Sequence, residues 1–173
     1  MTKERIAAAI RDVKDFPSPG IIYKDITPLL KDPALFAESI AMLAEVCRKQ
    51  RPDYIAAVES RGFIFGAALS IQLGCGFIPV RKKGKLPFHT ISETYELEYG
   101  RAEVEVHNDA LRPGDRVVLI DDVLATGGTA RAAARLLKRL GAEIAGIDFL
   151  LELSFLHGRN NLAEYEVNAL LRT

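Results

Sequence analysis

Residues 117–130 read VVLIDDVLATGGTA, and this stretch decides the fold. The four aliphatic residues at its start, two of them β-branched, predict a strand buried on both faces. Two acids, Asp121 and Asp122, stand where that strand is expected to end. Residues 125–129 predict a small turn, and the apolar spacing of residues 130–140 predicts a helix. The stretch is therefore predicted to be one strand–turn–helix unit of an α/β fold.

The turn between strand and helix is predicted to bind an anion. It consists of Ala125, Thr126, Gly127, Gly128 and Thr129. Backbone N–H groups at the start of a helix, together with the positive end of the helix dipole, attract a negative group. The two glycines allow close backbone approach, and the two threonine hydroxyls add donors. These residues predict a phosphate-binding turn.

The acid pair narrows the kind of ligand. A bare phosphate would be repelled by Asp121 and Asp122, so a simple phosphate cradle does not account for them. The acids are explained if the ligand also carries hydroxyls, such as a ribose diol, or comes with a divalent cation. The sequence therefore predicts a site for a ribose phosphate with magnesium. The magnesium ion is expected near the two acids and held mainly by substrate and water.

Other phosphate signatures do not fit these residues. The Walker pattern needs Gly-Lys-Ser/Thr, and no lysine follows Gly128; the dinucleotide fingerprint needs Gly-x-Gly-x-x-Gly, and only adjacent glycines are present. The alternative is an ordinary turn whose glycines reverse the chain and whose acids cap the helix. Capping requires only one acid, which favours the binding site.

The rest of the chain alternates between helical and strand patterns. The predicted helices are residues 3–13, 33–49, 62–73 and 130–140, and the predicted strands are residues 54–58, 77–80, around 104–106, 117–120, 144–151 and 166–171. The fold class is therefore α/β, a single domain with a mostly parallel central sheet flanked by helices. Ligands bind at the carboxyl ends of such strands. Glu59, Arg81 and Asp121 each follow a different predicted strand.

Composition limits the possible partners. The 173 residues suffice for one domain with a substantial core. Twenty-three basic and 23 acidic side chains balance, so neither nucleic acid nor a membrane surface is a predicted partner. No apolar run approaches the roughly 20 residues of a membrane span, and no signal-peptide profile opens the chain. Cys47 and Cys75 lack metal-ligand spacing and are interpreted as reduced thiols of a cytoplasmic protein.

Cations gather after the strand at residues 77–80. The run Arg81-Lys82-Lys83-Gly84-Lys85 places four of them within five positions. The alternative is a solvated basic loop, but the strand delivers this run to the ligand end of the sheet. Cations there would stabilise negative charge on a ligand or a departing group. Arg61, at the start of the helix that follows Glu59, is a further predicted ligand of such an anion.

Residues 86–100 show no strong periodicity and are predicted to form a mobile lid. A lid would serve chemistry at the C1 carbon of a ribose. That carbon becomes oxocarbenium-like as its leaving group departs, and water would otherwise capture it.

Several motifs, in order along the chain, resemble those of the adenine phosphoribosyltransferases, a type I phosphoribosyltransferase family. They are residues 15–30 (DFPSPGIIYKDITPLL), 59–63 (ESRGF), 81–87 (RKKGKLP), 95–100 (YELEYG) and the stretch quoted first. The resemblance runs from about Phe16 to Leu153, and the last twenty residues match more loosely. It implies a small N-terminal base-binding hood, residues 1–32, on an α/β core, residues 33–173.

The resemblance implies magnesium-dependent transfer of a phosphoribosyl group from 5-phosphoribosyl 1-diphosphate to adenine, giving AMP and pyrophosphate in purine salvage. Its implied catalytic residues are Glu98, Tyr99 and Arg61; its adenine-binding residues are Ile22, Tyr23, Lys24 and Val123; and its diphosphate-sugar ligands are Arg61, Arg81, Lys82, Lys85, Asp121, Asp122, Ala125, Thr126, Gly127, Gly128 and Thr129. It also implies a homodimer, with Arg81 reaching into the partner's site.

Two points stay open at the level of sequence. Where the family pattern is aliphatic, phenylalanine, arginine, this chain has Ile22, Tyr23 and Lys24. Stacking and backbone recognition of the base survive this change, but a role for a guanidinium does not. A non-catalytic regulator that senses the diphosphate sugar is the other functional class. The balanced charge and the lack of a helix-turn-helix extension argue against it.

Overall fold

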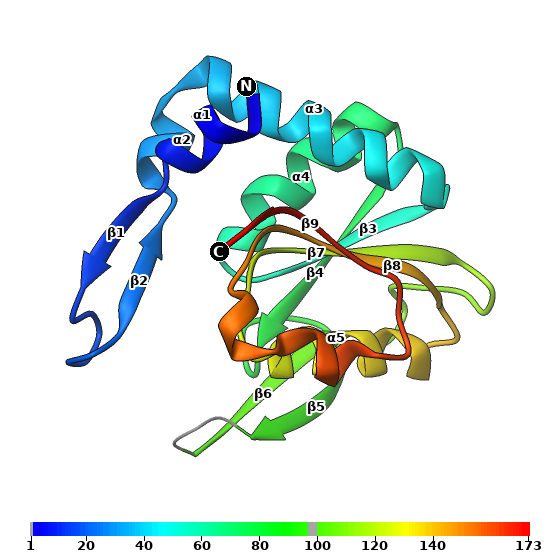
Figure 1. The fold of residues 1–173 in the computed structure, drawn as a ribbon. Helices are drawn as coiled ribbons and strands as arrows, with labels where there is room; N and C mark the ends of the chain where they lie inside the picture. The colour runs from blue at the N-terminus through cyan, green and yellow to red at the C-terminus, as the bar shows by residue number, and fades with distance from the viewer. Residues whose placement is uncertain (1, 97–99) are drawn as a thin grey trace. The chain divides into compact units, whose positions relative to one another are not determined.

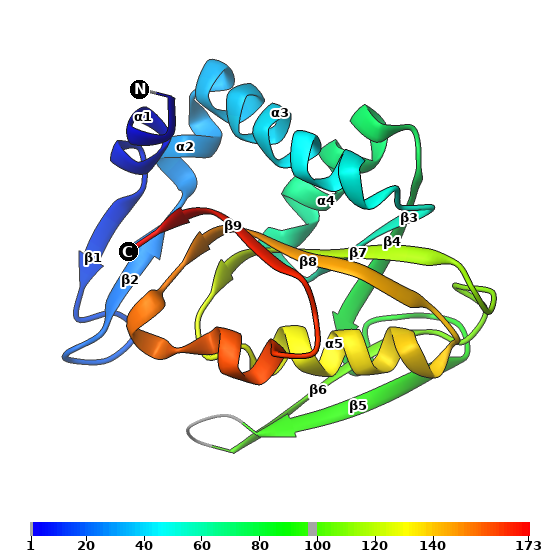
Figure 2. The same ribbon diagram turned by 45° about the vertical axis from the view of Figure 1, so that its right-hand side comes forward.

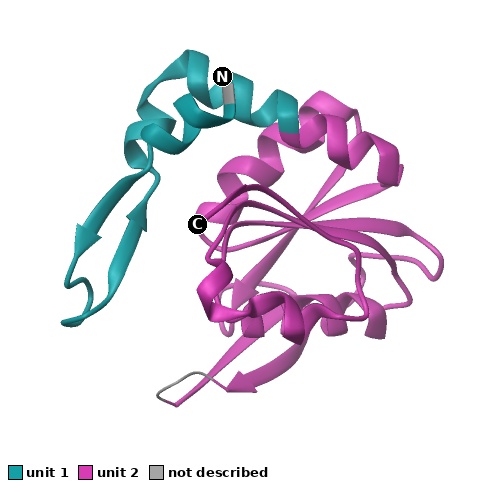
Figure 3. Cartoon of the chain, in the orientation of Figure 1, with its two compact units in different colours: residues 1–42 teal, residues 43–173 magenta. Residues whose placement is uncertain are grey.

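The computed structural model describes residues 2–96 and 100–173 of the chain (Figure 1). These residues form two compact units, residues 1–42 and residues 43–173 (Figure 3). Helix α3, Pro33–Gln50, contributes to both, and its bounds confirm the predicted helix. No helix in the described part of the chain is long and apolar enough to cross a membrane.

The first unit contains a two-stranded ribbon that the sequence did not predict. Helix α1, Thr2–Ala8, ends well before the predicted residue 13, and β1, Arg11–Lys14, pairs antiparallel with β2, Ile22–Asp25. A short helix α2, Thr27–Lys31, follows.

Opposite charges hold this ribbon in register. Arg11 faces Asp25 at 2.6 Å, and Lys24 faces Asp12 at 2.7 Å, both as direct cross-strand partners. The turn is closed by the Asp15 carboxylate, which accepts the Gly20 N–H at 2.7 Å. Residues up to 14 apart in sequence thus override the local helical pattern.

The second unit is built on a seven-stranded sheet in the order β5-β6-β4-β3-β7-β8-β9. Its strands are β3 Tyr54–Val58, β4 Gly76–Lys82, β5 Thr90–Glu96, β6 Arg101–His107, β7 Arg116–Leu124, β8 Glu143–Glu152 and β9 Val167–Arg172. The five strands from β4 to β9 are parallel, whereas β6 and β5 run antiparallel at one edge. The predicted mostly parallel sheet is confirmed.

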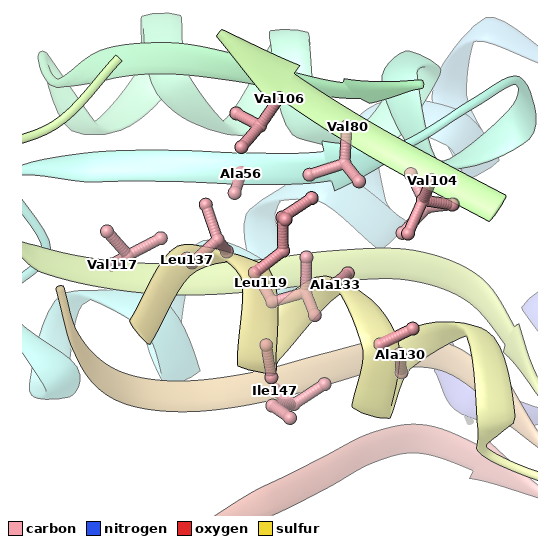
Figure 4. Packing of buried hydrophobic residues seen from close by; sticks show 14 of the residues in the cluster. Ala56, Val80, Val104, Val106, Val117, Leu119, Ala130, Ala133, Leu137 and Ile147 are labelled. Carbon is pink, nitrogen blue, oxygen red and sulfur yellow. The ribbon is translucent and has the colours of Figure 1, made fainter. Parts of the chain in front are cut away.

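Helices cover both faces of this sheet. Helix α4, Arg61–Leu73, lies on one face, and α5, Gly128–Arg139, lies on the other (Figures 1 and 2). Ala130, Ala133 and Leu137 recur along one side of α5 and are buried, and Figure 4 shows them packed near Leu119 of β7. After β8 the chain forms two short 3-10 helices, η1 Ser154–Leu156 and η2 Gly158–Leu162.

The predicted lid segment contains more structure than expected. Residues 90–96 form strand β5, paired with β6 along its whole length, so the prediction of a stretch without secondary structure was wrong there. Cross-strand pairing supplies the order that periodicity did not reveal. Strand β6 is also less exposed than predicted, since Glu105 between the two buried valines is itself only 2% exposed.

A buried polar cluster lies between α3 and the far half of the sheet. The Asp148 carboxylate on β8 has no exposed surface. It accepts hydrogen bonds from Gln50 Nε2 at 3.2 Å, Asn168 Nδ2 at 3.0 Å and the Cys47 thiol at 3.3 Å. Burial raises the pKa of Asp148, and burial beside this carboxylate raises the pKa of Cys47 well above its usual value.

Candidate active site

Three neighbouring parallel strands bring the predicted site residues to one edge of the sheet. β4, β3 and β7 are adjacent, and Glu59, Arg81 and Asp121 lie at or near their carboxyl ends. The Glu59 N–H donates to the Val80 carbonyl at 2.9 Å, which holds the ends of β3 and β4 together. The convergence predicted from topology is confirmed.

The acid pair lies within β7, because this strand continues to Leu124 beyond the predicted end. Asp122 is 5% exposed, and its Oδ2 atom lies 2.7 Å from Arg61 Nε. Asp121 is half-buried, and its Oδ1 atom accepts the Asp122 N–H at 2.9 Å. The structure therefore places Arg61, at the start of α4, directly against the acids of β7.

Burial and mutual repulsion disturb both carboxyl groups. Withdrawal from water raises the pKa of Asp121 well above its usual range, and the charge of Asp122 raises it further. Burial also raises the pKa of Asp122, although the Arg61 guanidinium opposes this effect. The two groups titrate as a pair that holds a proton more readily than ordinary aspartates do. Such a pair gains from ligand hydroxyls or a cation that would favour its charged form.

Gly62 allows α4 to approach the acid pair. A Cβ atom at this position would lie 2.8 Å from Asp121 Oδ1 and 3.1 Å from the Ile120 carbonyl oxygen. Any side chain here would push α4, and Arg61 with it, away from β7. The glycine in the Ser60-Arg61-Gly62 motif thus has a packing role that sequence reasoning did not assign.

The turn predicted to bind a phosphate lies between β7 and α5, as expected. Gly127 is the N-cap residue, with a positive φ of 82°, and no side chain described in the structure caps the helix. The first N–H groups of α5 are therefore left for another acceptor, as an anion site requires.

Gly127 is needed for a different reason than the sequence indicated. Its positive φ favours glycine, and a Cβ atom there would lie 2.4 Å from the Gly158 carbonyl oxygen. The absence of a side chain at Gly127 thus leaves room for the backbone of Gly158 rather than for a ligand. Gly128 has more room, since the nearest atom to a Cβ there is Tyr95 Cδ2 at 3.6 Å.

Thr129 already has a protein partner. Its hydroxyl donates to the Tyr95 hydroxyl at 3.2 Å, so strand β5 meets the start of α5 at this residue. The predicted donor role of Thr129 therefore involves Tyr95, a residue that sequence reasoning placed only within a family motif. Thr126 is exposed, whereas Ala125 and Val123 are half-buried.

The cations of the basic segment face different partners. Arg81 Nε donates to Glu59 Oε2 at 3.0 Å, and its Nη1 donates to the Lys85 carbonyl at 2.9 Å. Lys83 turns toward Ser92 and Glu103, at 3.0 and 3.1 Å. No ion pair is recorded for the ammonium groups of Lys82 and Lys85 within the described ranges. These two lysines, both exposed, are the cations of the run most available to an anionic ligand.

Two buried or half-buried glutamates shape this segment. Glu59 Oε2 also accepts the Lys82 N–H at 3.0 Å. Glu105 Oε1 accepts the N–H groups of Lys85 and Leu86, both at 2.9 Å. Burial alone would raise the pKa of Glu105, but these backbone hydrogen bonds outweigh it and lower the pKa. The glutamates fix the backbone that presents the cations, and sequence reasoning gave Glu105 no such role.

The predicted base-binding residues lie on the ribbon of the first unit. Ile22, Tyr23 and Lys24 form most of β2, and Tyr23 packs edge-on against Phe16 with ring centroids 5.2 Å apart. The ribbon has only two strands, so the outer edge of β2 carries no further strand among the described residues. Backbone groups on such an edge can recognise a ligand. The fourth residue of this set, Val123, lies in the second unit.

Two predicted catalytic residues, Glu98 and Tyr99, lie outside the described residues. The chain reaches them from the ends of β5 and β6, which Glu96 and Arg101 mark.

The carboxylate oxygens of the acid pair fit a magnesium ion that receives most of its ligands from substrate and water. Among the described residues no group of three or more His, Cys, Asp or Glu side chains forms a protein cage for a metal. The buried Asp122 Oδ2 atom lacks a hydrogen bond of good geometry, although Arg61 lies close to it. Magnesium is commonly held by one or two carboxylates together with substrate phosphates.

Nearly the whole chain matches known proteins. Residues 25–158 match the phosphoribosyl transferase domain family. The chain is 53% identical to the adenine phosphoribosyltransferase of Carboxydothermus hydrogenoformans, over 94% of this chain and 96% of that protein. This chain belongs to the adenine phosphoribosyltransferase family and is a transferase.

Solved structures agree with the family. The adenine phosphoribosyltransferase of Thermoanaerobacter pseudethanolicus superposes with a TM-score of 0.97 at 51% identity, covering 99% of both chains. The Saccharomyces cerevisiae enzyme, solved with adenine and an imino-altritol bisphosphate, gives a TM-score of 0.92 at 40% identity and covers 98% of both chains.

Proposed function

We propose that this chain transfers the 5-phosphoribosyl group of 5-phosphoribosyl 1-diphosphate to adenine, giving AMP and pyrophosphate with magnesium, in cytoplasmic purine salvage. The observation that carries the proposal is the acid pair on β7, which leads into a helix start without a side-chain cap. Acids for a ribose diol and N–H groups for a phosphate thus follow one another along the chain. The relatives named above, one of them solved with adenine, support the choice of base.

In this proposal the turn from Ala125 to Thr129 binds the 5-phosphate through backbone N–H groups and hydroxyls. Asp121 and Asp122 accept hydrogen bonds from the ribose hydroxyls, which fixes the sugar relative to the phosphate. Arg61 holds the acids in place and lies near the pyrophosphate. Fixing the sugar at three points places C1 in a reactive geometry, which removes much of the entropic barrier.

The cations then act on the leaving group. The bond between C1 of the ribose and the diphosphate oxygen breaks, and its electron pair leaves with pyrophosphate. Lys82, Lys85 and Arg81 stabilise that charge, because Glu59 and Glu105 hold their backbone in advance of the reaction. Bound near Asp121 and Asp122, magnesium would neutralise diphosphate charge.

The acceptor and the lid complete the reaction. Tyr23 gives a stacking surface for adenine, backbone groups of Ile22 and Lys24 read its edge, and Val123 contacts the base. An imidazole nitrogen of adenine forms the new bond to C1 and loses its proton. Glu98 accepts that proton as a general base, and Tyr99 closes over the site together with Glu98.

A competition of acceptors tests the base. We would incubate the protein with magnesium and the diphosphate sugar, and supply adenine, hypoxanthine, guanine, xanthine or orotate. Adenine should be converted with a kcat/KM at least about 100-fold above the others, since a site that reads donors and acceptors rejects a mismatched edge. Preference for another base would refute the assignment. Binding of the sugar without transfer to any base would favour the regulator.

We also propose that the chain acts as a homodimer in which Arg81 of one subunit serves the site of the other. Co-expression of Arg81→Ala with Asp121→Asn/Asp122→Asn should then restore activity, because one site of the mixed dimer combines intact acids with an intact Arg81. Each variant alone should be inactive. A fully active monomer of 19.0 kDa in sedimentation would rule out the dimer.

A further inference from the structure

The phosphate-binding turn is supported from behind by η2, a segment that no motif marks. The two meet backbone to backbone at a pair of glycines. A Cβ atom on Gly127 would lie 2.4 Å from the Gly158 carbonyl oxygen, and a Cβ atom on Gly158 would lie 2.2 Å from the Ala125 carbonyl oxygen. Because neither position has room for a side chain, η2 contacts the backbone of the turn itself.

One side chain of η2 also contacts the turn. Asn161 Nδ2 donates a hydrogen bond to the Thr126 carbonyl oxygen at 2.8 Å. The peptide between Thr126 and Gly127 is planar, so its carbonyl and its N–H point in opposite directions. Holding the carbonyl on the η2 side therefore turns the Gly127 N–H to the other side of the turn. Gly127 is in the left-handed conformation, in which successive N–H groups can converge on an anion.

The support is itself anchored to the sheet. Arg159 forms two hydrogen bonds with Glu152 at the end of β8, both at 2.8 Å, and a third with the Val167 carbonyl of β9 at 2.6 Å. Leu162 at the other end of η2 is fully buried. Asn161 thus extends from a fixed segment and can hold the peptide of the turn without moving with it.

We propose that Asn161 is a positioning residue that holds the Thr126–Gly127 peptide with its N–H toward the 5-phosphate of the diphosphate sugar. This inference rests on the proposed function. The hydrogen bond joins two groups of the protein itself, so it can orient the donor without a contact between Asn161 and the ligand. The residue acts on one end of the substrate only, because the cations of the basic segment hold the pyrophosphate end.

The test uses that separation. We would measure inhibition by ribose 5-phosphate, which carries the 5-phosphate, and by pyrophosphate, which does not, for the wild type, Asn161→Ala, Asn161→Asp and Asn161→Gln. Losing one hydrogen bond of about 0.5–1.5 kcal/mol should weaken the binding of ribose 5-phosphate about 2- to 12-fold in the Ala variant. The Asp variant should be at least as weak, since it replaces a donor with an acceptor. Pyrophosphate inhibition should not change.

Two controls make the result decisive. Asn160→Ala alters the neighbouring exposed asparagine, for which no side-chain hydrogen bond is recorded in the described chain, and it should behave as the wild type. Asn161→Gln keeps an amide donor and should recover part of the lost affinity. Equal weakening of both inhibitors, or no weakening, would overturn the inference. If the wild type binds neither inhibitor nor the diphosphate sugar, the proposed function fails first, which is a distinguishable outcome.

Discussion

Two groups of buried or half-buried aspartates lie on adjacent strands and differ in how their oxygens are satisfied. Asp148 on β8 is paired in register with Ile120, one residue before Asp121 on β7. All three aspartates have a raised pKa, chiefly because of burial. Yet Asp148 accepts hydrogen bonds from three uncharged side chains, whereas the pair on β7 is contacted by the charged Arg61 side chain and by backbone N–H groups.

The difference is the one expected between a structural acid and a ligand-binding one. Asp148 lies in the middle of its strand, where donors from α3 and β9 surround it, so both of its oxygens accept hydrogen bonds from the protein. Asp121 and Asp122 lie near the end of their strand, and the buried Asp122 Oδ2 atom lacks a hydrogen bond of good geometry there. A raised pKa is therefore common to both groups, and an unsatisfied buried oxygen is what sets the pair on β7 apart.

The largest effect on activity is expected when the charges of Asp121 and Asp122 on β7 are removed. Asp121→Asn with Asp122→Asn should lower kcat/KM by at least about 10³-fold, because the ribose loses charged acceptors that fix it for reaction. Steady-state kinetics would measure this. Asp148→Asn makes the same chemical change on the next strand and serves as the matched control, with activity near that of the wild type. Activity near the wild-type level in the double variant would contradict the ribose assignment.

The next effect concerns stability. Asp148→Ala removes the acceptor of the buried Gln50 amide and of the half-buried Asn168 amide, and leaves a small cavity. The free energy of unfolding should fall by about 2–4 kcal/mol, while kcat/KM of the folded protein stays unchanged. Urea denaturation and kinetics measure the two quantities. In Asp148→Asn the remaining oxygen can still accept both amides, so a loss as large as that of Ala would refute the hydrogen-bond explanation.

A third effect depends on pH. A raised pKa means that the folded chain binds the proton more tightly than the unfolded chain, whose aspartates titrate near 3.8. This stabilisation is complete below pH 3.8 and is lost as the pH rises through the folded-state pKa. The slope can reach about 1.4 kcal/mol per pH unit for each group.

Denaturation at a series of pH values would test this. As the pH rises above 4, the free energy of unfolding of the wild type should fall relative to that of Asp148→Asn. It should fall in the same way relative to that of the Asp121→Asn/Asp122→Asn variant. The latter variant would then be more stable yet inactive, as expected where function requires poorly satisfied acids. Parallel curves for all three proteins would show that these pKa values are not raised.

The smallest effect concerns Cys47, the weakest donor to Asp148. Cys47→Ser keeps a donor, and Cys47→Ala removes it. The Ala variant should lose about 1 kcal/mol of stability, and the Ser variant less, because a thiol contributes little as a donor. Thermal unfolding would resolve the two. A loss above about 3 kcal/mol in the Ala variant would mean that the cluster depends on the thiol more than its 3.3 Å contact indicates.

The sequence by itself determined the central α/β unit and the edge of the sheet at which the predicted site residues meet. β7, the turn and α5 were predicted because each depends on neighbours in the chain: an aliphatic run, adjacent glycines and helical spacing. The convergence of Glu59, Arg81 and Asp121 followed from the topology of parallel strands. The family motifs added adenine as the predicted base, and the lack of periodicity in residues 86–100 added the predicted lid. The placement of Glu98 and Tyr99 stays a prediction.

Only the tertiary structure decided the features that depend on distant residues. The residues of β1 were predicted to continue a helix. They form a strand because ion pairs with β2 set their register, and the local pattern does not contain those partners. The burial of Glu105 follows from the loop that wraps its carboxylate, and β5 is ordered by pairing with β6. Asn161 reaches Thr126 across 35 residues of sequence. Local sequence patterns show which secondary structure a segment prefers. The hydrogen-bond partner of a backbone group, however, depends on which residues the fold places beside it, and these can be distant in sequence.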